Sequence, residues 1–182
     1  MFNLITLDGY FEGIHKWDID WHQVDDEFNE FAIEQLNLAD GLIFGRVTYQ
    51  GMASYWPTPT AIESDPIVAA RMNSIRKYVF SKTLDKAEWN NTQLINGDAI
   101  EELNRMKGET GNELFIFGSA NLSSTFTRHN LIDEYRVIIN PIVLGEGVPL
   151  FKEEDGNLKF KLLNTRIFHN GNVLLYYAPD GR

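Results

Sequence analysis

The sequence predicts an α/β fold built around a mostly parallel sheet. Apolar runs of strand length alternate with amphipathic stretches, and the turn-forming residues fall between these segments. Near the C-terminus an Asn-Gly pair separates two long β-type segments. Alternating strands and helices favour parallel strands with helices on both faces, and the late Asn-Gly pair adds an antiparallel hairpin.

The expected elements follow from these patterns in chain order. Strands are expected at residues 2–6, 41–44, 77–80, 113–117 and 135–140. Helices are expected between them, at residues 25–38, 67–75, 99–106 and 120–128. The hairpin comprises residues 160–168 and 172–177, on either side of His169-Asn170-Gly171. Residues 141–151 contain Gly145, Gly147 and Pro149, and this interruption predicts a shaped loop.

Size and composition limit the possible classes of protein. The 182 residues are 43% hydrophobic, enough to bury one core, so a single domain over residues 1–182 is expected. The formal net charge of -10 repels nucleic acid and anionic membrane surfaces, so neither is an expected partner. The absence of cysteine excludes disulfides, thiolate zinc sites and cysteine nucleophiles.

Targeting and metal-binding signals are also missing from the sequence. The N-terminus lacks a signal-peptide pattern and no run of about 18 apolar residues occurs, so a cytoplasmic location is expected. The four histidines are scattered along the chain without the spacing of metal ligands, so no metal site is expected. The sequence contains neither a Walker-type loop nor a nucleophile elbow.

Three strand ends carry residues suited to a dinucleotide. In open α/β sheets, ligands bind beyond the carboxyl ends of the strands. At the first end, Gly45 permits a close backbone approach to phosphate, while Arg46 and Thr48 add charge and a hydroxyl. This junction can cradle a pyrophosphate. The alternative is an ordinary glycine turn with a solvated arginine.

The second strand end consists of Ser81, Lys82 and Thr83. Two hydroxyls around a lysine could bind an adenosine 2′-phosphate, which would select NADPH over NADH. The alternative is a polar turn, since serine and threonine are common turn residues.

The third strand end comprises five consecutive residues: Gly118, Ser119, Ala120, Asn121 and Leu122. Its small residues would let a flat ring or a phosphate lie against the backbone, but a tight packing turn needs the same residue types. Three such ends in one chain favour an anionic ligand.

A series of short motifs extends along nearly the whole chain. They are Thr6-Leu7-Asp8-Gly9-Tyr10, Gly45-Arg46-Val47-Thr48-Tyr49, Tyr55-Trp56-Pro57, Ser81-Lys82-Thr83-Leu84, Phe117-Gly118-Ser119-Ala120-Asn121-Leu122, Leu131-Ile132-Asp133-Glu134-Tyr135, and Pro141 to Phe151 with Gly145 and Gly147. As an ordered series they resemble dihydrofolate-reductase-like proteins of the RibD C-terminal type, from riboflavin biosynthesis. This resemblance implies a three-layer αβα sandwich with a mainly parallel mixed sheet and a C-terminal antiparallel hairpin.

The same resemblance implies that NADPH lies across the strand ends. Gly45, Arg46 and Thr48 would then meet the cofactor phosphates, and Ser81 and Lys82 the adenosine 2′-phosphate. The segment Gly118 to Leu122 would meet the pyrophosphate and the nicotinamide ribose. In this family the end of the first strand lies beside the nicotinamide and the substrate, which makes Asp8 the candidate catalytic residue.

The expected function is an NADPH-dependent reductase acting on a small heterocycle of the pteridine, pyrimidine or flavin-precursor type. In such an enzyme the cofactor supplies the hydride, and the protein supplies orientation and one proton. Asp8 could position the substrate ring or relay that proton, although an aspartate before glycine is also a common turn residue. Folate is not expected as the substrate, because Asp25, Asp26 and Glu27 offer no clear counterpart to the acidic residue with which folate reductases bind a pterin.

Further expectations concern the pocket, the turnover and the assembly. The candidate walls of the substrate pocket are Leu7, Trp21, Tyr49 and Trp56, with ordinary packing as the alternative for these side chains. The alternative function is a non-catalytic nucleotide-binding or sensor protein, since a fold does not guarantee its chemistry. The family resemblance also implies a homodimer, with residues 131–142 as the expected interface.

Overall fold

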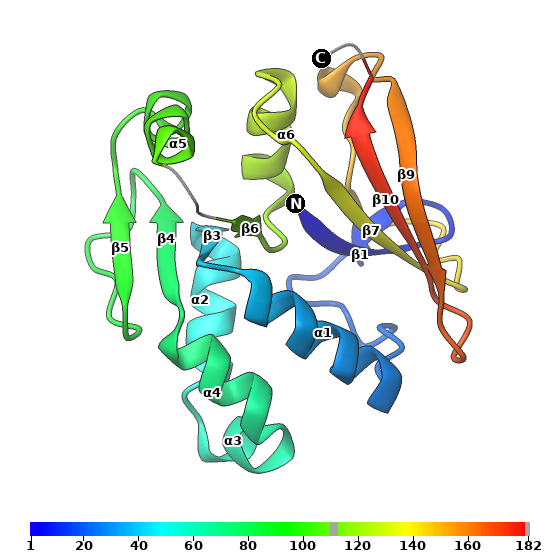
Figure 1. Ribbon diagram of the computed structural model, residues 1–182, viewed down its shortest axis with the longest axis horizontal. Coiled ribbons are helices and arrows are strands. Elements are labelled where there is room, and N and C mark those ends of the chain that lie inside the picture. Colours follow the sequence, from blue (N-terminus) through cyan, green and yellow to red (C-terminus); the bar gives the residue numbers. More distant parts are fainter. Residues whose placement is uncertain (110–112, 181–182) are drawn as a thin grey trace. The chain divides into compact units, whose positions relative to one another are not determined.

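The computed structural model of the protein describes residues 1–109 and 113–180 (Figure 1). The chain divides into two compact units. Unit 1 comprises Met1–Phe28 and Ala120–Arg182, and unit 2 comprises Asn29–Ser119. The expectation of one domain over the whole chain stays a prediction.

Unit 2 contains a wholly parallel sheet with the strand order β5-β4-β3-β6. Its strands are β3 (Gly41–Gly45), β4 (Arg76–Phe80), β5 (Thr92–Ile95) and β6 (Leu114–Ile116). Leu42, Ile43 and Phe44 are almost completely buried, as expected for a parallel strand covered on both faces. Gly45 lies opposite Phe80, which lies opposite Ile95. The carboxyl ends of these neighbouring strands therefore share one edge of the sheet.

The helices that lie wholly within unit 2 differ in how their first turns are capped. They are α2 (Arg46–Tyr55), α3 (Pro59–Ser64), α4 (Pro66–Ser74) and α5 (Ala99–Gly108). Thr58 caps α3 by accepting a hydrogen bond from the backbone N–H of Ala61, and Asp98 caps α5 in the same way from Ile100 and Glu101. Both α3 and α4 have a proline in their first turn, where the missing N–H costs nothing.

A buried lysine closes the C-terminal end of α4. Lys77 is completely buried, and its Nζ donates to the carbonyl oxygens of Met72 at 2.8 Å and Ile75 at 2.7 Å. The same ammonium lies 4.4 Å from the centroid of the Trp89 ring. Burial lowers the pKa of Lys77 to about 8. This side chain thus satisfies carbonyl groups that the helix end would leave without partners.

Unit 1 contains a mixed sheet with the strand order β1-β7-β10-β9. Its strands are β1 (Phe2–Thr6), β7 (Tyr135–Asn140), β9 (Phe160–Ile167) and β10 (Val173–Pro179). β1 runs parallel to β7, while β10 runs antiparallel to both β7 and β9. The turn between β9 and β10 contains Gly171, whose φ of +90° lies in the region that favours glycine. The predicted Asn-Gly hairpin is therefore confirmed.

The remaining elements of unit 1 are short or lie at its boundary. α6 (Ala120–Arg128) follows the last residue of unit 2, and α1 (Asp26–Leu38) begins in unit 1 and continues into unit 2. Asp25 caps α1, because its Oδ1 accepts from the backbone N–H of Phe28. β2 (Tyr10–Glu12) and β8 (Val148–Pro149) form an antiparallel two-stranded sheet, and residues Glu153–Asp155 form a single 3₁₀ turn.

The α/β fold with a parallel sheet and an antiparallel C-terminal hairpin is confirmed. The predicted bounds of β1, β7 and α6 agree with the structure. β5, α3 and the β2–β8 ribbon are additional elements that the sequence patterns did not indicate. Among the described helices, none combines the length and the hydropathy needed to cross a membrane.

Candidate functional site

The three predicted cofactor segments follow neighbouring strands in the unit 2 sheet. Ser81 follows β4, Arg46 follows β3, and Gly118 lies two residues beyond β6. The sheet order places β3 between β4 and β6, with all three strands parallel. The structure therefore brings these segments to the same edge of one sheet, where open α/β folds bind their ligands.

Ser119 joins two of these strand ends through its hydroxyl group. Its Oγ accepts from the backbone N–H of Gly45 at 2.7 Å and donates to Thr48 Oγ1 at 2.8 Å. Gly118 and Ser119 both have a φ of +60°, a left-handed conformation that costs about 1 kcal/mol or more for a residue other than glycine. The junction after β6 is thus bonded to the junction between β3 and α2.

The N-terminus of α2 is built to attract an anion. The extended Gly45 precedes the helix without a side-chain cap from its own residue, so the first-turn amides have no such partner. Arg46 is exposed, and its Nη1 donates to Gln50 Oε1 at 3.1 Å. Together, first-turn amides, the helix dipole and a guanidinium favour negative charge at this end.

The Ser81 segment has the geometry of a turn. Ser81 Oγ accepts from the backbone N–H groups of Thr83 at 3.2 Å and Leu84 at 3.0 Å. Its backbone N–H donates to Ile95, which ties β4 to β5. Because a hydroxyl can donate while its oxygen accepts, these bonds leave the Ser81 O–H able to reach a ligand. Lys82 and Thr83 are exposed at the same turn.

The second half of the third predicted segment belongs to unit 1. Ala120 is buried at the start of α6, and Leu122 is half-buried. The side-chain oxygen of Asn121 accepts a hydrogen bond from Lys152 Nζ. Roles for Ala120, Asn121 and Leu122 in cofactor binding stay predictions.

Asp8, the predicted catalytic residue, lies in unit 1 at the end of β1. Its carboxylate accepts from Thr6 Oγ1 at 2.6 Å, from the Gly145 N–H at 2.8 Å and from the Leu144 N–H at 3.3 Å. The hydrogen bond from Thr6 is the largest of the effects that lower the pKa of Asp8. The carboxylate is therefore ionised at neutral pH, and each of its two oxygens accepts at least one hydrogen bond from within the protein.

The four predicted substrate-pocket residues are divided between the units. Leu7 and Trp21 belong to unit 1, whereas Tyr49 and Trp56 belong to unit 2. Leu7 is 66% exposed, and Trp21 Nε1 donates to the Asp18 carbonyl oxygen at 3.0 Å. Trp56 Nε1 contacts Met52 Sδ at 3.2 Å. A pocket shared by all four side chains stays a prediction.

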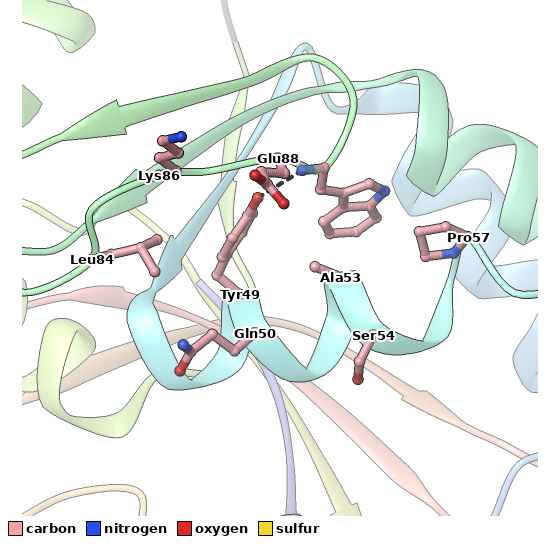
Figure 2. A pocket seen from close by; sticks show the side chains of 9 residues that line it. Tyr49, Gln50, Ala53, Ser54, Pro57, Leu84, Lys86 and Glu88 are labelled. Carbon is pink, nitrogen blue, oxygen red and sulfur yellow. Dashed lines mark hydrogen bonds between the residues drawn. The ribbon is translucent and has the colours of Figure 1, made fainter.

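A pocket of about 550 Å³ lies in unit 2 between α2 and the segment after β4 (Figure 2). Tyr49 lines this pocket, whereas Trp56 is not among the lining residues. Tyr49 Oη accepts from the backbone N–H of Trp89 at 3.0 Å, and Trp89 Nε1 donates to Asn73 Oδ1 at 2.7 Å. The lining residues are Tyr49, Gln50, Ala53, Ser54, Pro57, Leu84, Lys86, Glu88 and Trp89.

Sequence reasoning did not indicate Trp89 as a functional or structural residue. Its only sequence signal is an aromatic residue within the polar segment Glu88-Trp89-Asn90-Asn91. In the structure Trp89 is 6% exposed and also lies under the Lys77 ammonium. Trp89 is thus a buried anchor of the loop, and its aromatic ring in a polar stretch was the signal that sequence reasoning passed over.

His22 is a second residue whose environment the sequence did not reveal. Burial lowers the pKa of His22 to about 4, so the ring is neutral at physiological pH. Its ring stands edge-on to Trp21, with 4.4 Å between the centroids. Within residues 1–109 and 113–180, His22 Nε2 has no hydrogen-bond partner. Over the same residues, no group of three or more His, Asp and Glu side chains is arranged to hold a metal ion.

The family model of the RibD C-terminal domain matches residues 1–174 of this chain. The chain belongs to the RibD C-terminal domain family. Within Bacillus subtilis (strain 168), the uncharacterized protein YyaP is 34% identical over 179 residues, covering 97% of this chain and 92% of YyaP. The uncharacterized protein YwjB of the same strain is 30% identical over 177 residues, covering 96% of this chain and 93% of YwjB.

Solved structures share the fold of this RibD C-terminal domain. A Shewanella sp. PV-4 protein named for riboflavin biosynthesis superposes with a TM-score of 0.74 at 23% identity, covering 98% of this chain and 97% of that one. A diaminohydroxyphosphoribosylaminopyrimidine deaminase/5-amino-6-(5-phosphoribosylamino)uracil reductase of Thermotoga maritima gives 0.66 at 18% identity, covering 97% of this chain and 55% of that one. Dihydrofolate reductase from Enterococcus faecalis, complexed with NADP(H), gives 0.64 at 12% identity, covering 98% and 94%. The chain therefore has a reductase-type fold.

Proposed function

We propose that this protein is an NADPH-dependent reductase that transfers a hydride to a small heterocycle. The observation that carries the proposal is the row of three adjacent strand ends in unit 2, two of which are joined by the Ser119 hydrogen bonds. Membership of the RibD C-terminal domain family and the reductase-type fold support the same reaction class.

The donor set at these strand ends fits a phosphorylated dinucleotide. The whole chain carries a formal net charge of -10, so a polyanionic cofactor must be held by local groups. The amides at the α2 N-terminus, the guanidinium of Arg46 and the hydroxyl of Thr48 are such groups. In the proposed complex these groups bind the pyrophosphate. Ser119 holds Gly45 and Thr48 in position through its two hydrogen bonds.

The Ser81 turn is proposed to distinguish NADPH from NADH. Ser81 can donate its hydroxyl proton, and Lys82 supplies a positive charge on the same exposed turn. A phosphate at the adenosine 2′ position would meet both groups, whereas a 2′-hydroxyl would leave the Lys82 charge unused. When bound, NADPH supplies the hydride, and the residues of this chain bind and orient the cofactor.

The proposed substrate class is a pteridine, a pyrimidine or a flavin precursor. The Thermotoga maritima structure named above carries a uracil reductase in its name, which makes aminopyrimidines the first compounds to test. Hydride transfer to such a ring needs positioning and one proton rather than a protein nucleophile.

Cofactor titration tests the binding half of the proposal. Protein fluorescence is followed as NADPH or NADH is added to the wild-type protein and to Arg46→Gln, Lys82→Gln and, as a control for lost positive charge, the exposed Lys16→Gln. Both site variants are expected to weaken NADPH binding, and Lys82→Gln also reduces the preference over NADH by about 10- to 100-fold, as for a lost charged hydrogen bond. Unchanged NADPH affinity in both site variants would refute the site.

Turnover is tested by following the loss of NADPH absorbance with a panel of heterocycles. Oxidation of NADPH by at least one panel member is the expected result. Tight NADPH binding without oxidation would favour the alternative, a nucleotide-binding or sensor protein with the same residues at its strand ends.

A further inference from the structure

Three donors converge on the carboxylate of Asp8 and form a unit that we name the Asp8 clamp. Its members are Thr6, Asp8, Leu144 and Gly145. The hydroxyl of Thr6 fixes the carboxylate from the strand side, while the two backbone N–H groups belong to the loop after β7. The side chain of Asp8, just after β1, thus binds the loop that follows β7, and β7 runs parallel to β1.

Other bonds hold the same loop, residues 141–147, along the segment after β1. The Leu7 N–H donates to the Ile142 carbonyl oxygen at 2.8 Å, and Tyr10 Oη donates to the Gly145 carbonyl oxygen at 3.3 Å. Beyond the loop, the Leu150 N–H donates to the Gly9 carbonyl oxygen at 3.1 Å. The Asp8 clamp is therefore the side-chain part of a longer row of contacts.

Two glycines show that this loop follows a demanding backbone path. Gly145 has a φ of +81°, which other residues rarely adopt. At Gly147 a Cβ atom would lie 2.4 Å from the Glu12 carbonyl oxygen, closer than atoms can approach. A loop of this shape needs a fixed anchor, and the Asp8 carboxylate provides one.

Two exposed apolar residues are the sequence neighbours of clamp members. Leu7 is 66% exposed and Val143 is 63% exposed, and the two residues flank the hydrogen bond between Leu7 N–H and the Ile142 carbonyl oxygen. They follow the carboxyl ends of β1 and β7, which run parallel with Thr6 opposite Asn140. Apolar side chains at such strand ends suit the face of a flat ring.

We infer that Asp8 is a positioning residue: it holds residues 141–147 so that Leu7 and Val143 form one apolar wall for the heterocyclic ring of the substrate. This inference rests on the proposed function, because it names the chain's contacts with the proposed substrate class. It is an alternative to the role in which Asp8 relays a proton, because a carboxylate whose two oxygens both accept hydrogen bonds from the protein is held in one orientation.

Asp8→Asn and Val143→Ser test the inference, with the exposed Asp20→Asn as the control for loss of one negative charge. Asparagine retains one acceptor oxygen but replaces the other with an amide nitrogen that cannot accept. Three quantities are measured on the folded proteins: amide hydrogen exchange at Leu144 and Gly145, the Kd of an aminopyrimidine by calorimetry, and the pH profile of NADPH oxidation.

Asp8→Asn is expected to accelerate exchange at Leu144 and Gly145 and to raise the Kd and the KM of the heterocycle about tenfold, as for one lost charged hydrogen bond. The shape of the pH profile and kcat should stay close to those of the wild type. Val143→Ser should raise the same Kd without changing the exchange rates. The double variant should bind about as weakly as Asp8→Asn, because both changes remove the same wall.

A collapse of kcat in Asp8→Asn, together with the loss of one limb of the pH profile, would overturn the inference in favour of proton relay. Unchanged exchange and unchanged Kd in Asp8→Asn would overturn it as well. A wild-type protein that binds the aminopyrimidine without oxidising NADPH contradicts the proposed reductase, and the Kd values still decide the role of Asp8. A wild-type protein that binds none of the panel heterocycles refutes both.

Discussion

The burial of His22 makes the stability of unit 1 depend on pH in the acidic range. An unfolded histidine has a pKa near 6.5, whereas burial lowers that of His22 in the folded chain to about 4. Between these values the unfolded state binds more protons than the folded state, so the free energy of unfolding rises with pH. Stability contributed by the neutral ring is thus complete above pH 6.5 and is lost as the pH falls to about 4.

Replacing His22 with leucine is expected to remove this acid sensitivity. The leucine variant should lose less stability than the wild type between pH 7 and pH 4, by up to about 3 kcal/mol. At pH 7 it should be at least as stable, because the unpartnered Nε2 atom disappears with the ring. Urea denaturation of both proteins at the two pH values measures the difference. Equal losses in the two proteins would show that the neutral ring does not govern the acid response.

Single residues show how far the sequence could predict the candidate site. Gly45, Arg46 and Ser119 were predicted as cofactor-binding residues because glycine, arginine and serine after apolar runs have recognisable uses at strand ends, and the structure places all three at one sheet edge while their role stays a prediction. The environments of His22 and Trp89 could not be predicted, because their burial depends on segments distant in the sequence. The bonds of Asp8 to Leu144 and Gly145 span more than 130 residues, and no local pattern indicates them.

Among the secondary-structure elements, the junctions around α2 depend on Ser119 for both geometry and stability. Ser119→Ala would lose the bonds to Gly45 and Thr48 and would keep a left-handed residue with a Cβ atom. We expect a loss of about 2 kcal/mol in the free energy of unfolding, from the hydrogen bonds of a partly buried hydroxyl.

Ser119→Gly is the matched comparison for this prediction. Glycine loses the same hydrogen bonds but adopts a φ of +60° without strain, so it should be about 1 kcal/mol more stable than Ser119→Ala. Urea denaturation monitored by tryptophan fluorescence distinguishes the two variants. If both variants lost the same stability, backbone strain at residue 119 would have no measurable cost.

The elements predicted correctly are those with strong local signals. β1, β7 and α6 combine an apolar pattern with neighbouring turn residues, which for β1 lie only after its C-terminal end. β5 was missed because Thr92–Ile95 has only four residues, half of them polar, and its strand state depends on pairing with β4. β2 and β8 are likewise too short to give a periodic signal, and they exist because the loop they border is bonded to the end of β1.

For the whole molecule, we propose a homodimer that uses β9 as its pairing edge. β7, within the interface expected from the sequence, has β1 on one side and β10 on the other, so a partner strand cannot pair with it. β9 ends the sheet order over the described residues and contains eight residues without glycine or proline. Leu162, Leu163 and Ile167 on this strand are 50%, 49% and 75% exposed. Exposed apolar side chains on a long edge strand favour pairing with another strand.

Light scattering after size-exclusion chromatography tests the homodimer. The wild-type protein is expected to have the mass of two chains, and Leu163→Lys the mass of one, because it adds a third cation to an edge strand that already carries Lys161 and Arg166. Glu30→Lys, an exposed change on α1, should keep the dimer. A wild-type monomer at micromolar concentration would contradict the proposal.

The left-handed pair Gly118-Ser119 has a consequence for the order in which the chain folds. The hydroxyl of Ser119 gains its partners only after Gly45 and Thr48, 74 and 71 residues away, have reached it. Before those bonds form, the left-handed conformation at residue 119 would cost free energy without any compensating bond. The folding nucleus should therefore form without this turn. Substitutions there should accelerate unfolding while leaving the refolding rate nearly constant, and the turn should close as one of the last steps on the way to the native state.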